Sequence, residues 1–436
     1  MSKALIIGNG KSGKAAEKLL NSIGYETIIT DSQNISKIRD RTLKALSLVV
    51  LSPAVSIDDP GVKLLKNYTD NIIGEMELSY MFLACKTVAI TGTNGKTTTT
   101  ILIGEMCKKI AKTYVGGNIG VPASSFAKQT KKDDLCVLEV SSFQAESFVN
   151  FKPYIGVFLN FSQDHLNRHK TMDSYYVAKI KMFVRQTQND FAVLNFDDKN
   201  VRKLAGKLKS NVYYFSDKDK VKGCYLKSDC IYFRDKKVEK IGKMPQSIRE
   251  AHNKQNALAA CTVAKLLGVR NCDILDVLQS FKPSESRIEM VQVVDGISYI
   301  NDSKGTNIAS TLSAIREMKQ KTVLIVGGSD KGYEFDELFT FDNKKVKAIV
   351  AVGETSAKIV QAAKRNNYKN IFVANSFCDA ILLAKQKTKS GDTVLLSPAC
   401  ASFDMFSSYK ERGNAFKAIV REIENESNKN AGETKK

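Results

Sequence analysis

Short apolar runs alternate with helix-length amphipathic segments along most of the chain. The first run, "KALII" at residues 3–7, leads into a glycine-rich turn and a helical pattern, and the next run, "ETIIT", ends just before Asp31. Runs of this length bounded by turn residues predict buried strands. Their alternation with helix-length segments is typical of parallel sheets with crossover helices. We therefore predict an α/β fold.

The same pattern divides the chain into three blocks, which we interpret as domains. Residues 1–84 predict a Rossmann-like domain, and residues 85–283 a central P-loop ATPase-type domain with a parallel or mixed sheet. Residues 284–424 predict a second Rossmann-like domain, because "TVLIVGG", "VKAIVAVG", "NIFVAN" and "DTVLLSP" recur there at helix-length spacing. We expect crossover helices in every block. Residues 425–436 are polar, and we expect them to form a disordered tail.

The segment "VAITGTNGKTTTTILI", residues 88–103, nearly spells a phosphate-binding P-loop. A strand over 86–91 and a helix over 97–109 would place the loop at a helix N-terminus, where free N–H groups and the helix dipole favour an anion. Lys96 could reach the terminal phosphates and the Thr97 hydroxyl could bind Mg²⁺. The usual first glycine is missing, since Ile90 stands there. A plain strand–turn–helix with a surface lysine is the alternative.

A second glycine-rich turn, "GNGKSG", lies near the N-terminus. Gly8, Gly10 and Gly13 follow a predicted strand, and Asp31 follows the next one. This spacing matches the dinucleotide fingerprint, but the motif alone indicates only that a pyrophosphate could bind at that helix N-terminus.

Three further residues of the central block are candidates for chemistry. Glu139 ends the apolar run "LCVLE", and His165 follows the next predicted strand, so both are expected at the ligand-binding edge of the sheet. Lys179 has apolar or aromatic neighbours at helical spacing on both sides. Partial burial would lower its pKa and make its amine a nucleophile, although a snorkelling side chain is an alternative.

The amino-acid composition indicates which kind of ligand the protein binds and in which cellular compartment it occurs. The formal net charge is +20, which could indicate a nucleic-acid-binding protein. However, only 13 of the 66 basic residues are Arg, and the lysines are spread along the chain. This distribution favours small anionic substrates over nucleic acid. Nine cysteines without a C-x-x-C pair indicate reduced thiols of a cytoplasmic protein. We expect neither a signal peptide nor a membrane span, since no apolar run approaches 18 residues.

Taken together, the motifs resemble those of the Mur ligases, the amide-forming ligases of peptidoglycan synthesis. They are "GNGKSG", "GEMEL", "TGTNGKTTT", "GGNIG", "LEVSSFQ", "DHLNRH" with "YYVAK", "HNKQNALAA", "NDSKGTN", "GGSDKG" and "LLSPACASFDMF". The short phosphate loop is the form that this family uses, and the last motif resembles the D-glutamate-adding members. The resemblance implies that ATP phosphorylates the carboxylate of UDP-N-acetylmuramoyl-L-alanine and that D-glutamate attacks the acyl phosphate. A monomer is expected.

The resemblance also implies roles for particular residues. ATP would be held by Gly92, Thr93, Asn94, Gly95, Lys96, Thr97, Thr98, Asn253, Asn256, Arg287, Asp302 and Lys304. The UDP-linked substrate would be held by Lys11, Ser12, Asp31, Ser52, Asn118 and His165. D-Glutamate would be held by Thr306, Lys331, Ser402 and Tyr409. Two Mg²⁺ sites are implied, one at Thr97 and Glu139 and one at His165 and Lys179. The lysine would carry CO₂ as a carbamate, because Mg²⁺ prefers oxygen ligands. Lys96, Glu139, His165 and Lys179 would form the catalytic set.

Some residues depart from the family pattern. Ser286 stands in place of a histidine, Ala54 in place of a glycine, and Tyr409 where phenylalanine is frequent. Three alternatives stay open: a folylpolyglutamate synthetase, an NAD-dependent dehydrogenase and a nucleotide-binding regulator without activity. The first would lack a UDP-fitting first domain, the second explains only "GNGKSG", and the third leaves Glu139, His165, Lys179 and Lys331 without a role.

Overall fold

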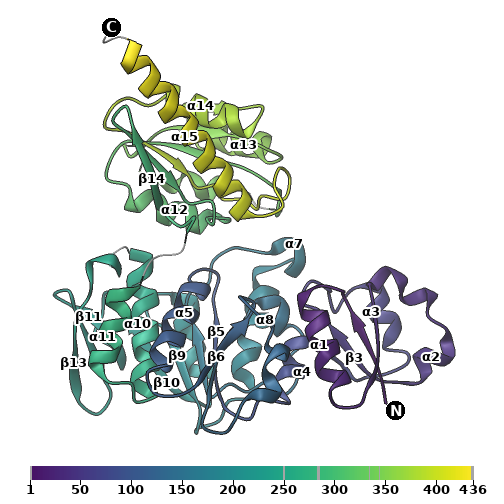
Figure 1. Ribbon diagram of the computed structural model, residues 1–436. Helices are drawn as coiled ribbons and strands as arrows, with labels where there is room; N and C mark the ends of the chain where they lie inside the picture. Colours follow the sequence, from purple (N-terminus) through teal and green to yellow (C-terminus); the bar gives the residue numbers. More distant parts are fainter. Residues whose placement is uncertain (1, 249–250, 282–284, 333, 343, 434–436) are drawn as a thin grey trace. The chain divides into compact units, whose positions relative to one another are not determined.

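Three β-sheets, one in each predicted block of the sequence, organise the chain (Figure 1). The computed structural model describes residues 2–248, 251–281, 285–332, 334–342 and 344–433. The chain separates into two compact units: residues 1–161 with 173–281, and residues 162–172 with 282–436. The first unit contains two of the sheets and the second contains the third. The α/β fold is confirmed. The expected boundary at residues 283 and 284 lies outside the described residues.

The first sheet has four parallel strands in the order β2-β1-β3-β4. Gly13 shows why its first turn needs glycine, because a Cβ there would lie 1.9 Å from the Gly8 carbonyl oxygen. Helix α1 can therefore approach the end of β1 closely. The strands are β1 (Lys3–Ile7), β2 (Glu26–Thr30), β3 (Leu46–Leu51) and β4 (Ile72–Gly74). The helices are α1 (Lys11–Asn21), η1 (Ser32–Lys37), α2 (Asp40–Lys44), α3 (Pro60–Leu65) and α4 (Glu75–Tyr80).

The second sheet has nine strands in the order β13-β12-β11-β10-β9-β8-β5-β7-β6. The strands are β5 (Lys86–Thr91), β6 (Thr113–Gly117), β7 (Leu135–Glu139), β8 (Ile155–Phe158), β9 (Phe191–Asn195), β10 (Asn211–Ser216), β11 (Gly223–Lys227), β12 (Cys230–Arg234) and β13 (Val238–Lys243). The helices are α5 (Lys96–Cys107), η2 (Ala123–Ser125), η3 (Ala127–Gln129), α6 (Ser142–Ala145), α8 (Met172–Val184), α9 (Lys199–Arg202), η4 (Lys203–Lys207), η5 (Gln246–Ile248), α10 (Ala251–Leu266) and α11 (Asn271–Ser280).

The sheet is mixed, which the prediction allowed, because one of its ends has no crossover helices among the described residues. Strands β11, β12 and β13 pair antiparallel. Ser228 and Asp229 connect β11 to β12, and both have positive φ, at 46° and 60°. Two left-handed residues match the twist of a tight β-hairpin, which needs no crossover helix.

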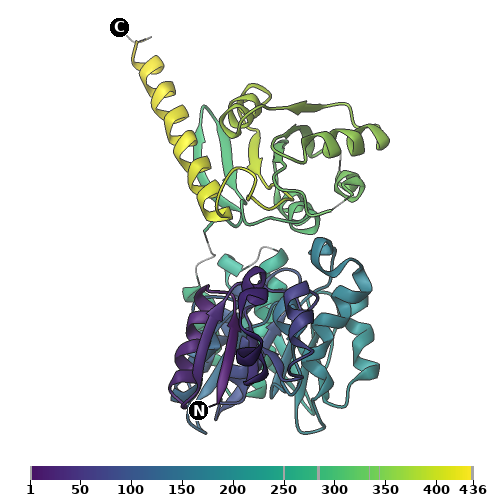
Figure 2. The same cartoon turned by 90° about the vertical axis from the view of Figure 1, so that its right-hand side faces the viewer.

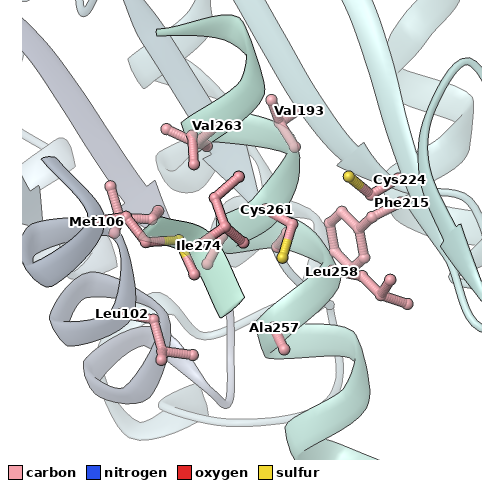
Figure 3. Packing of buried hydrophobic residues seen from close by; sticks show 14 of the residues in the cluster. Leu102, Met106, Val193, Phe215, Cys224, Ala257, Leu258, Cys261, Val263 and Ile274 are labelled. Atoms are coloured by element: carbon pink, nitrogen blue, oxygen red, sulfur yellow. The ribbon is translucent and has the colours of Figure 1, made fainter. Parts of the chain in front are cut away.

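The core of this sheet lies under helices α5 and α10 (Figure 3). Ala257, Leu258 and Cys261 of α10 are fully buried, and so is Phe215 of β10. Leu102 of α5 is 1% exposed. This packing fixes the helix that follows the phosphate loop against the helix that carries the "HNKQNALAA" motif.

The third sheet has six strands in the order β14-β15-β19-β16-β17-β18. The strands are β14 (Glu289–Val294), β15 (Ile297–Asn301), β16 (Thr322–Val326), β17 (Val346–Ala351), β18 (Ile371–Val373) and β19 (Thr393–Leu396). The helices of this unit are α7 (Leu166–His169), α12 (Ile308–Glu317), η6 (Asp336–Thr340), α13 (Ser356–Arg365), α14 (Phe377–Gln386) and α15 (Tyr409–Glu433). Here too one pair, β14 with β15, is an antiparallel hairpin rather than a crossover.

Helix α15 packs along this hairpin (Figure 2). It continues to Glu433, so the prediction of a disordered tail from residue 425 was wrong up to that residue.

The nine cysteines are free thiols, and five of them are buried. Cys272 and Cys378 are exposed, so these two do not belong to a core. Within the described residues, no helix is both long and apolar enough to cross a membrane.

Candidate active site

The loop between β5 and α5 has the geometry that a phosphate requires. Strand β5 ends at Thr91 and α5 begins at Lys96, with Gly95 as its N-cap. Gly95 has φ +83°, and a Cβ there would lie 2.2 Å from Asn256 Oδ1. A side chain is thus excluded both by backbone conformation and by space. The free N–H groups of the first turn of α5 face the loop, as an anion site needs.

Asn160 fixes the conformation of this loop. Its backbone carbonyl accepts from Thr93 N at 3.0 Å, and its side chain accepts from Asn94 N at 2.8 Å. Its Nδ2 donates back to the Asn94 carbonyl at 3.0 Å. Lys96 folds along the loop, with Nζ 2.8 Å from the carbonyl oxygens of both Gly92 and Thr93. The side chain that would contact phosphates is therefore already at the loop.

Glu139 joins the phosphate loop to the "GGNIG" segment. It ends β7, as predicted, and is 2% exposed. Its Oε2 accepts from the Thr97 hydroxyl and its Oε1 from Asn118 Nδ2, both at 2.8 Å. A hydroxyl and a carboxylate in contact are a donor set that fits Mg²⁺. Among the described residues no group of three or more His, Cys, Asp or Glu side chains could hold a metal.

Lys179 lies beneath the same loop. It is 1% exposed, and its Nζ donates to the Gly92 carbonyl at 2.9 Å. The Tyr175 ring lies 4.6 Å from Nζ, and the Tyr175 hydroxyl is 3.3 Å from Thr93 Oγ1. Phe183, one turn on, is 2% exposed. The lysine is thus buried with its amine beside the Tyr175 ring and directed at the phosphate loop.

Two asparagines of α10 lie against the start of α5. Asn253 is 3% and Asn256 is 4% exposed. Thr99 Oγ1 donates to Asn256 Oδ1 at 3.3 Å. The predicted nucleotide residues Asn256 and Gly95 are therefore in contact.

A large cavity adjoins the first glycine-rich turn. Its volume is about 850 Å³. Five of the six predicted UDP-substrate residues line it: Lys11, Ser12, Asp31, Ser52 and Asn118. Ala54, one of the departures from the family pattern, lies in the same wall. The sixth residue, His165, belongs to the other unit.

In the second unit, Asp302 is a fully buried carboxylate at the end of β15. Arg287 Nη1 lies 3.5 Å from its Oδ1, and the Ser397 hydroxyl donates to its Oδ2 at 2.7 Å. Burial raises the pKa of Asp302, and the Arg287 guanidinium opposes that rise. Lys304, two residues on, places its Nζ 5.9 Å from the centre of the Tyr409 ring.

The predicted D-glutamate residues also gather in the second unit. Lys331 Nζ donates to the Thr306 carbonyl at 3.0 Å. A bridge between Ser329 and Ala401 brings the "GGSDKG" loop beside the loop that contains the buried Ser402. A lysine and a hydroxyl on neighbouring loops are groups that suit the carboxylates of a small acid.

Sequence reasoning missed two residues that organise this cluster. Asp164 accepts from Lys331 Nζ and from Asn307 Nδ2, each at 3.1 Å. The only sequence feature that could have indicated a role for Asp164 was its position beside His165 in "DHLNRH". Arg412, 1% exposed, donates to the carbonyls of Ser303, Cys400 and Ala401 and so ties the "NDSKGTN" and "SPACAS" loops together. Burial lowers its pKa to about 10.

The predicted metal ligands do not all belong to one unit. Thr97, Glu139 and Lys179 belong to the first unit and His165 to the second. His165 is the N-cap of α7 and has φ 56°, with Nδ1 3.7 Å from Asp164 Oδ1. The second metal site therefore stays a prediction. Ser286, where the family pattern has histidine, is buried, and its backbone N–H donates to Glu289 Oε2 at 2.9 Å.

Comparison with known proteins gives consistent matches. A family model described as the Mur ligase middle domain matches residues 90–264, and one described as the Mur ligase, glutamate ligase domain matches residues 286–400. The chain is 39% identical to UDP-N-acetylmuramoylalanine--D-glutamate ligase of Caldanaerobacter subterraneus subsp. tengcongensis, over 97% of this chain and 98% of that protein. It is 40% identical to the protein of the same name from Clostridioides difficile, again over 97% and 98%.

Solved structures are similar over nearly the whole chain, and one of them serves as an example. It is MurF ligase from Thermotoga maritima in complex with ADP, with a TM-score of 0.58 and 16% identity, over 98% of this chain and 96% of that one. This match concerns the fold alone.

Proposed function

Because the chain belongs to the Mur ligase family, we propose that it joins D-glutamate to UDP-N-acetylmuramoyl-L-alanine at the expense of ATP, in peptidoglycan precursor synthesis. Two relatives matched over 97% of the chain carry the name of that ligase. The observation that carries the proposal is the contact set at Glu139, which joins the phosphate-loop hydroxyl of Thr97 to Asn118 on the wall of the large cavity. ATP and the UDP-linked substrate would meet there.

The reaction proceeds in two steps. An alanine carboxylate oxygen attacks the γ-phosphorus of ATP, so that an acyl phosphate forms and ADP leaves. The ammonium group of D-glutamate loses a proton to solvent, and the free amine attacks the carbonyl carbon of the acyl phosphate. The tetrahedral intermediate then collapses to an amide. Inorganic phosphate leaves and takes up the second proton of the amine nitrogen. Catalysis of this kind depends mainly on positioning and on charge neutralisation.

The phosphate loop would bind the ATP phosphates. Its backbone N–H groups, from Gly92 to Thr98, would donate to phosphate oxygens, and Lys96 would neutralise the terminal ones. Asn160 supports this role because it fixes the loop before any ligand binds. Asn253 and Asn256 would face the adenine side of the nucleotide.

Thr97 and Glu139 would hold one Mg²⁺, and His165 with carbamylated Lys179 a second. Such ions neutralise charge on the transferred phosphoryl group. The buried amine of Lys179, 2.9 Å from the Gly92 carbonyl, supports the second assignment, because CO₂ adds to an unprotonated amine and gives an oxygen ligand beside the loop.

The cavity of about 850 Å³ would hold the UDP-linked substrate. Lys11, the hydroxyls of Ser12 and Ser52, and the N-terminus of α1 suit a diphosphate, and Asp31 suits a ribose or uracil donor. His165 would contact the same substrate near its reacting end.

The second unit would bind D-glutamate and complete the ATP site. Thr306, Lys331, Ser402 and Tyr409 would hold the amino acid, and Arg287, Asp302 and Lys304 the nucleotide. Asp164 supports this assignment, since it holds Lys331 in place and adds a carboxylate that suits an ammonium group. We further propose domains at residues 1–84, 85–283 and 284–424, a monomer, and a cytoplasmic location, where ATP and the soluble substrates occur.

A panel of single amino acids tests the function. The protein is incubated with ATP, UDP-N-acetylmuramoyl-L-alanine and one amino acid at a time, and phosphate release is measured. Release is expected with D-glutamate and not with L-glutamate or D-alanine, and it should require the UDP-linked substrate. Release that needs no UDP-linked substrate, or that prefers another amino acid, would contradict the proposal. The Lys96→Ala variant serves as the inactive control.

A further inference from the structure

Two buried glutamates of α4 lie outside the residues assigned above. Glu75 is the first residue of α4 and follows β4 directly, and Glu77 lies on the same helix. Each is 1% exposed. Buried carboxyl groups are costly unless they accept hydrogen bonds, so each is expected to hold something in place.

Glu75 holds Ser124. Its Oε1 accepts from the Ser124 backbone N–H at 2.9 Å, from the Ser124 hydroxyl, and from the Ser79 hydroxyl at 3.1 Å. Its Oε2 is buried with no hydrogen-bond partner among the described residues. Burial raises the pKa of Glu75, and a protonated Oε2 is consistent with the missing donor.

Ser124 lies directly behind one wall of the large cavity. It belongs to η2, which follows the segment 117–122, and Gly117, Asn118, Ile119, Gly120 and Pro122 of that segment line the cavity. Helix η2 packs against both α1 and α4. A small second cavity beside Glu75 shares Ser52 and Gln144 with the large one.

The segment 117–122 is thus fixed near both ends by a carboxyl group. Near its start, Asn118 donates to Glu139 beside the phosphate loop. Just after its end, Ser124 donates to Glu75. Two of the six residues of the segment are glycines, Gly117 and Gly120, so the segment has few side-chain contacts of its own.

We propose that Glu75 is a positioning residue for the UDP-linked substrate: its buried carboxyl group holds Ser124 and thereby keeps the segment 117–122 in the conformation that lines the substrate cavity. This inference rests on the proposed function. Glu75 contacts no substrate itself, and its effect passes through the cavity wall.

Glu77 provides a matched control on the same helix. It accepts the backbone N–H groups of Val149 and Phe151 at 3.1 Å and of Asn150 at 2.6 Å. None of these three residues lines the cavity. Its removal should lower stability without changing substrate binding.

The test compares Glu75→Ala, Glu75→Gln and Glu77→Ala by steady-state kinetics and thermal melting. Glu75→Ala should raise the KM of the UDP-linked substrate about tenfold, because a buried donor loses its acceptor and the wall relaxes. The KM values of ATP and D-glutamate should change less than about twofold. Glu75→Gln keeps the acceptor oxygen and should restore a wild-type KM. Glu77→Ala should lower the melting temperature and leave all three KM values unchanged.

Two outcomes would overturn the proposal: an unchanged KM for the UDP-linked substrate in Glu75→Ala, or an equal rise of all KM values in Glu75→Ala and Glu77→Ala. If Glu75→Ala does not fold, the variant Ser124→Ala, which removes one of the three donors to Glu75 Oε1, must raise the KM of the UDP-linked substrate and no other KM. Failure of the role of Glu75 must be distinguished from failure of the proposed function, and calorimetric measurement of UDP binding to the wild type does this. A wild type that binds no UDP would refute the function, whereas tight UDP binding by both wild type and Glu75→Ala would refute only the role of Glu75.

Discussion

At the scale of single residues, Lys179 is the most unusual side chain of the first unit. Its exposed fraction is 1%, and its amine contacts a carbonyl of the phosphate loop. Burial of an amine is costly unless it makes hydrogen bonds, and the bond from Lys179 Nζ to the Gly92 carbonyl meets this need. Addition of CO₂ would convert the lysine into a carboxylate beside the ATP phosphates.

We predict that Lys179→Ala lowers the ligase rate by about a hundredfold or more, since the proposed carbamate ligand of the metal would be lost. Short carboxylic acids such as acetate should restore part of the rate by occupying the space of the carbamate. Lys181→Ala is the matched control, because Lys181 lies on the same helix and its Nζ donates to the Glu146 carbonyl instead. Wild-type turnover by Lys179→Ala in CO₂-depleted buffer would refute the carbamate.

Glu75 gives a prediction about pH. In the unfolded chain it ionises near its ordinary pKa of 4.5, whereas burial keeps it protonated to higher pH in the folded protein. The wild type therefore loses stability as pH rises from about 4.5 through the folded pKa. Glu75→Gln has no such loss, so its unfolding free energy relative to wild type should increase between pH 5 and pH 8. Urea denaturation at both values measures this, and a difference independent of pH would contradict the buried neutral acid.

Which residues could be predicted depended on whether residue type and spacing alone indicate their chemistry, as they do for Lys96, Glu139 and Lys179. Asp164 and Glu75 belong to the motifs "DHLNRH" and "GEMEL", but nothing in the spacing of these motifs indicates what either residue contacts, and the same holds for Arg412. Their partners lie far away in sequence, as with Asp164 and Lys331 or Arg412 and Ser303, and only the folded chain brings them together.

At the scale of elements, the parallel part of the fold followed from hydrophobic pattern, and the antiparallel part did not. Strand β5 spans the predicted residues 86–91, and β7 ends at Glu139 as expected. The β11–β12 hairpin was missed because its turn, Ser228–Asp229, has neither an Asn-Gly nor an Asp-Gly signal, although both residues adopt positive φ. The β14–β15 turn does contain such a signal, Asp295–Gly296, which the prediction from apolar runs did not use. Short strands joined by such turns resemble crossover strands in sequence.

The phosphate loop gives a prediction at this scale. Gly95→Ala should destabilise the protein by about 1–2 kcal/mol, because its φ of +83° disfavours a side chain. ATP affinity should fall as well, since the new methyl group would displace Asn256. Gly206→Ala is the control, because nothing lies within 4 Å of a Cβ there. Equal melting temperatures and equal ATP affinities for the two variants would contradict this account of the loop.

At the scale of the whole molecule, the residues proposed to bind the reactants belong to two different units. The phosphate loop and the UDP cavity belong to the first, and Lys331 with its neighbours to the second. The proposed function therefore assigns roles in one reaction to residues of both units. Residues of the first unit should act on phosphoryl transfer, and residues of the second on the amino acid.

This division predicts different defects in two lysine variants. Lys331→Ala should raise the D-glutamate KM at least about tenfold yet still form the acyl phosphate, because a charge-assisted contact to the amino acid is lost. Lys96→Ala should form none. Borohydride reduction without D-glutamate traps the intermediate as an alcohol. A Lys331→Ala protein that traps nothing and keeps a normal D-glutamate KM would assign Lys331 to phosphoryl transfer.

The central claim is that the carboxylate of the UDP-linked substrate is activated by ATP before D-glutamate attacks. Substrate labelled with oxygen-18 in the alanine carboxylate tests this most directly, because the acyl-phosphate route transfers one carboxylate oxygen to phosphorus. Mass spectrometry of the released phosphate after turnover with ATP and D-glutamate should then show a single oxygen-18 per phosphate. Unlabelled phosphate accompanying the amide product would contradict the account.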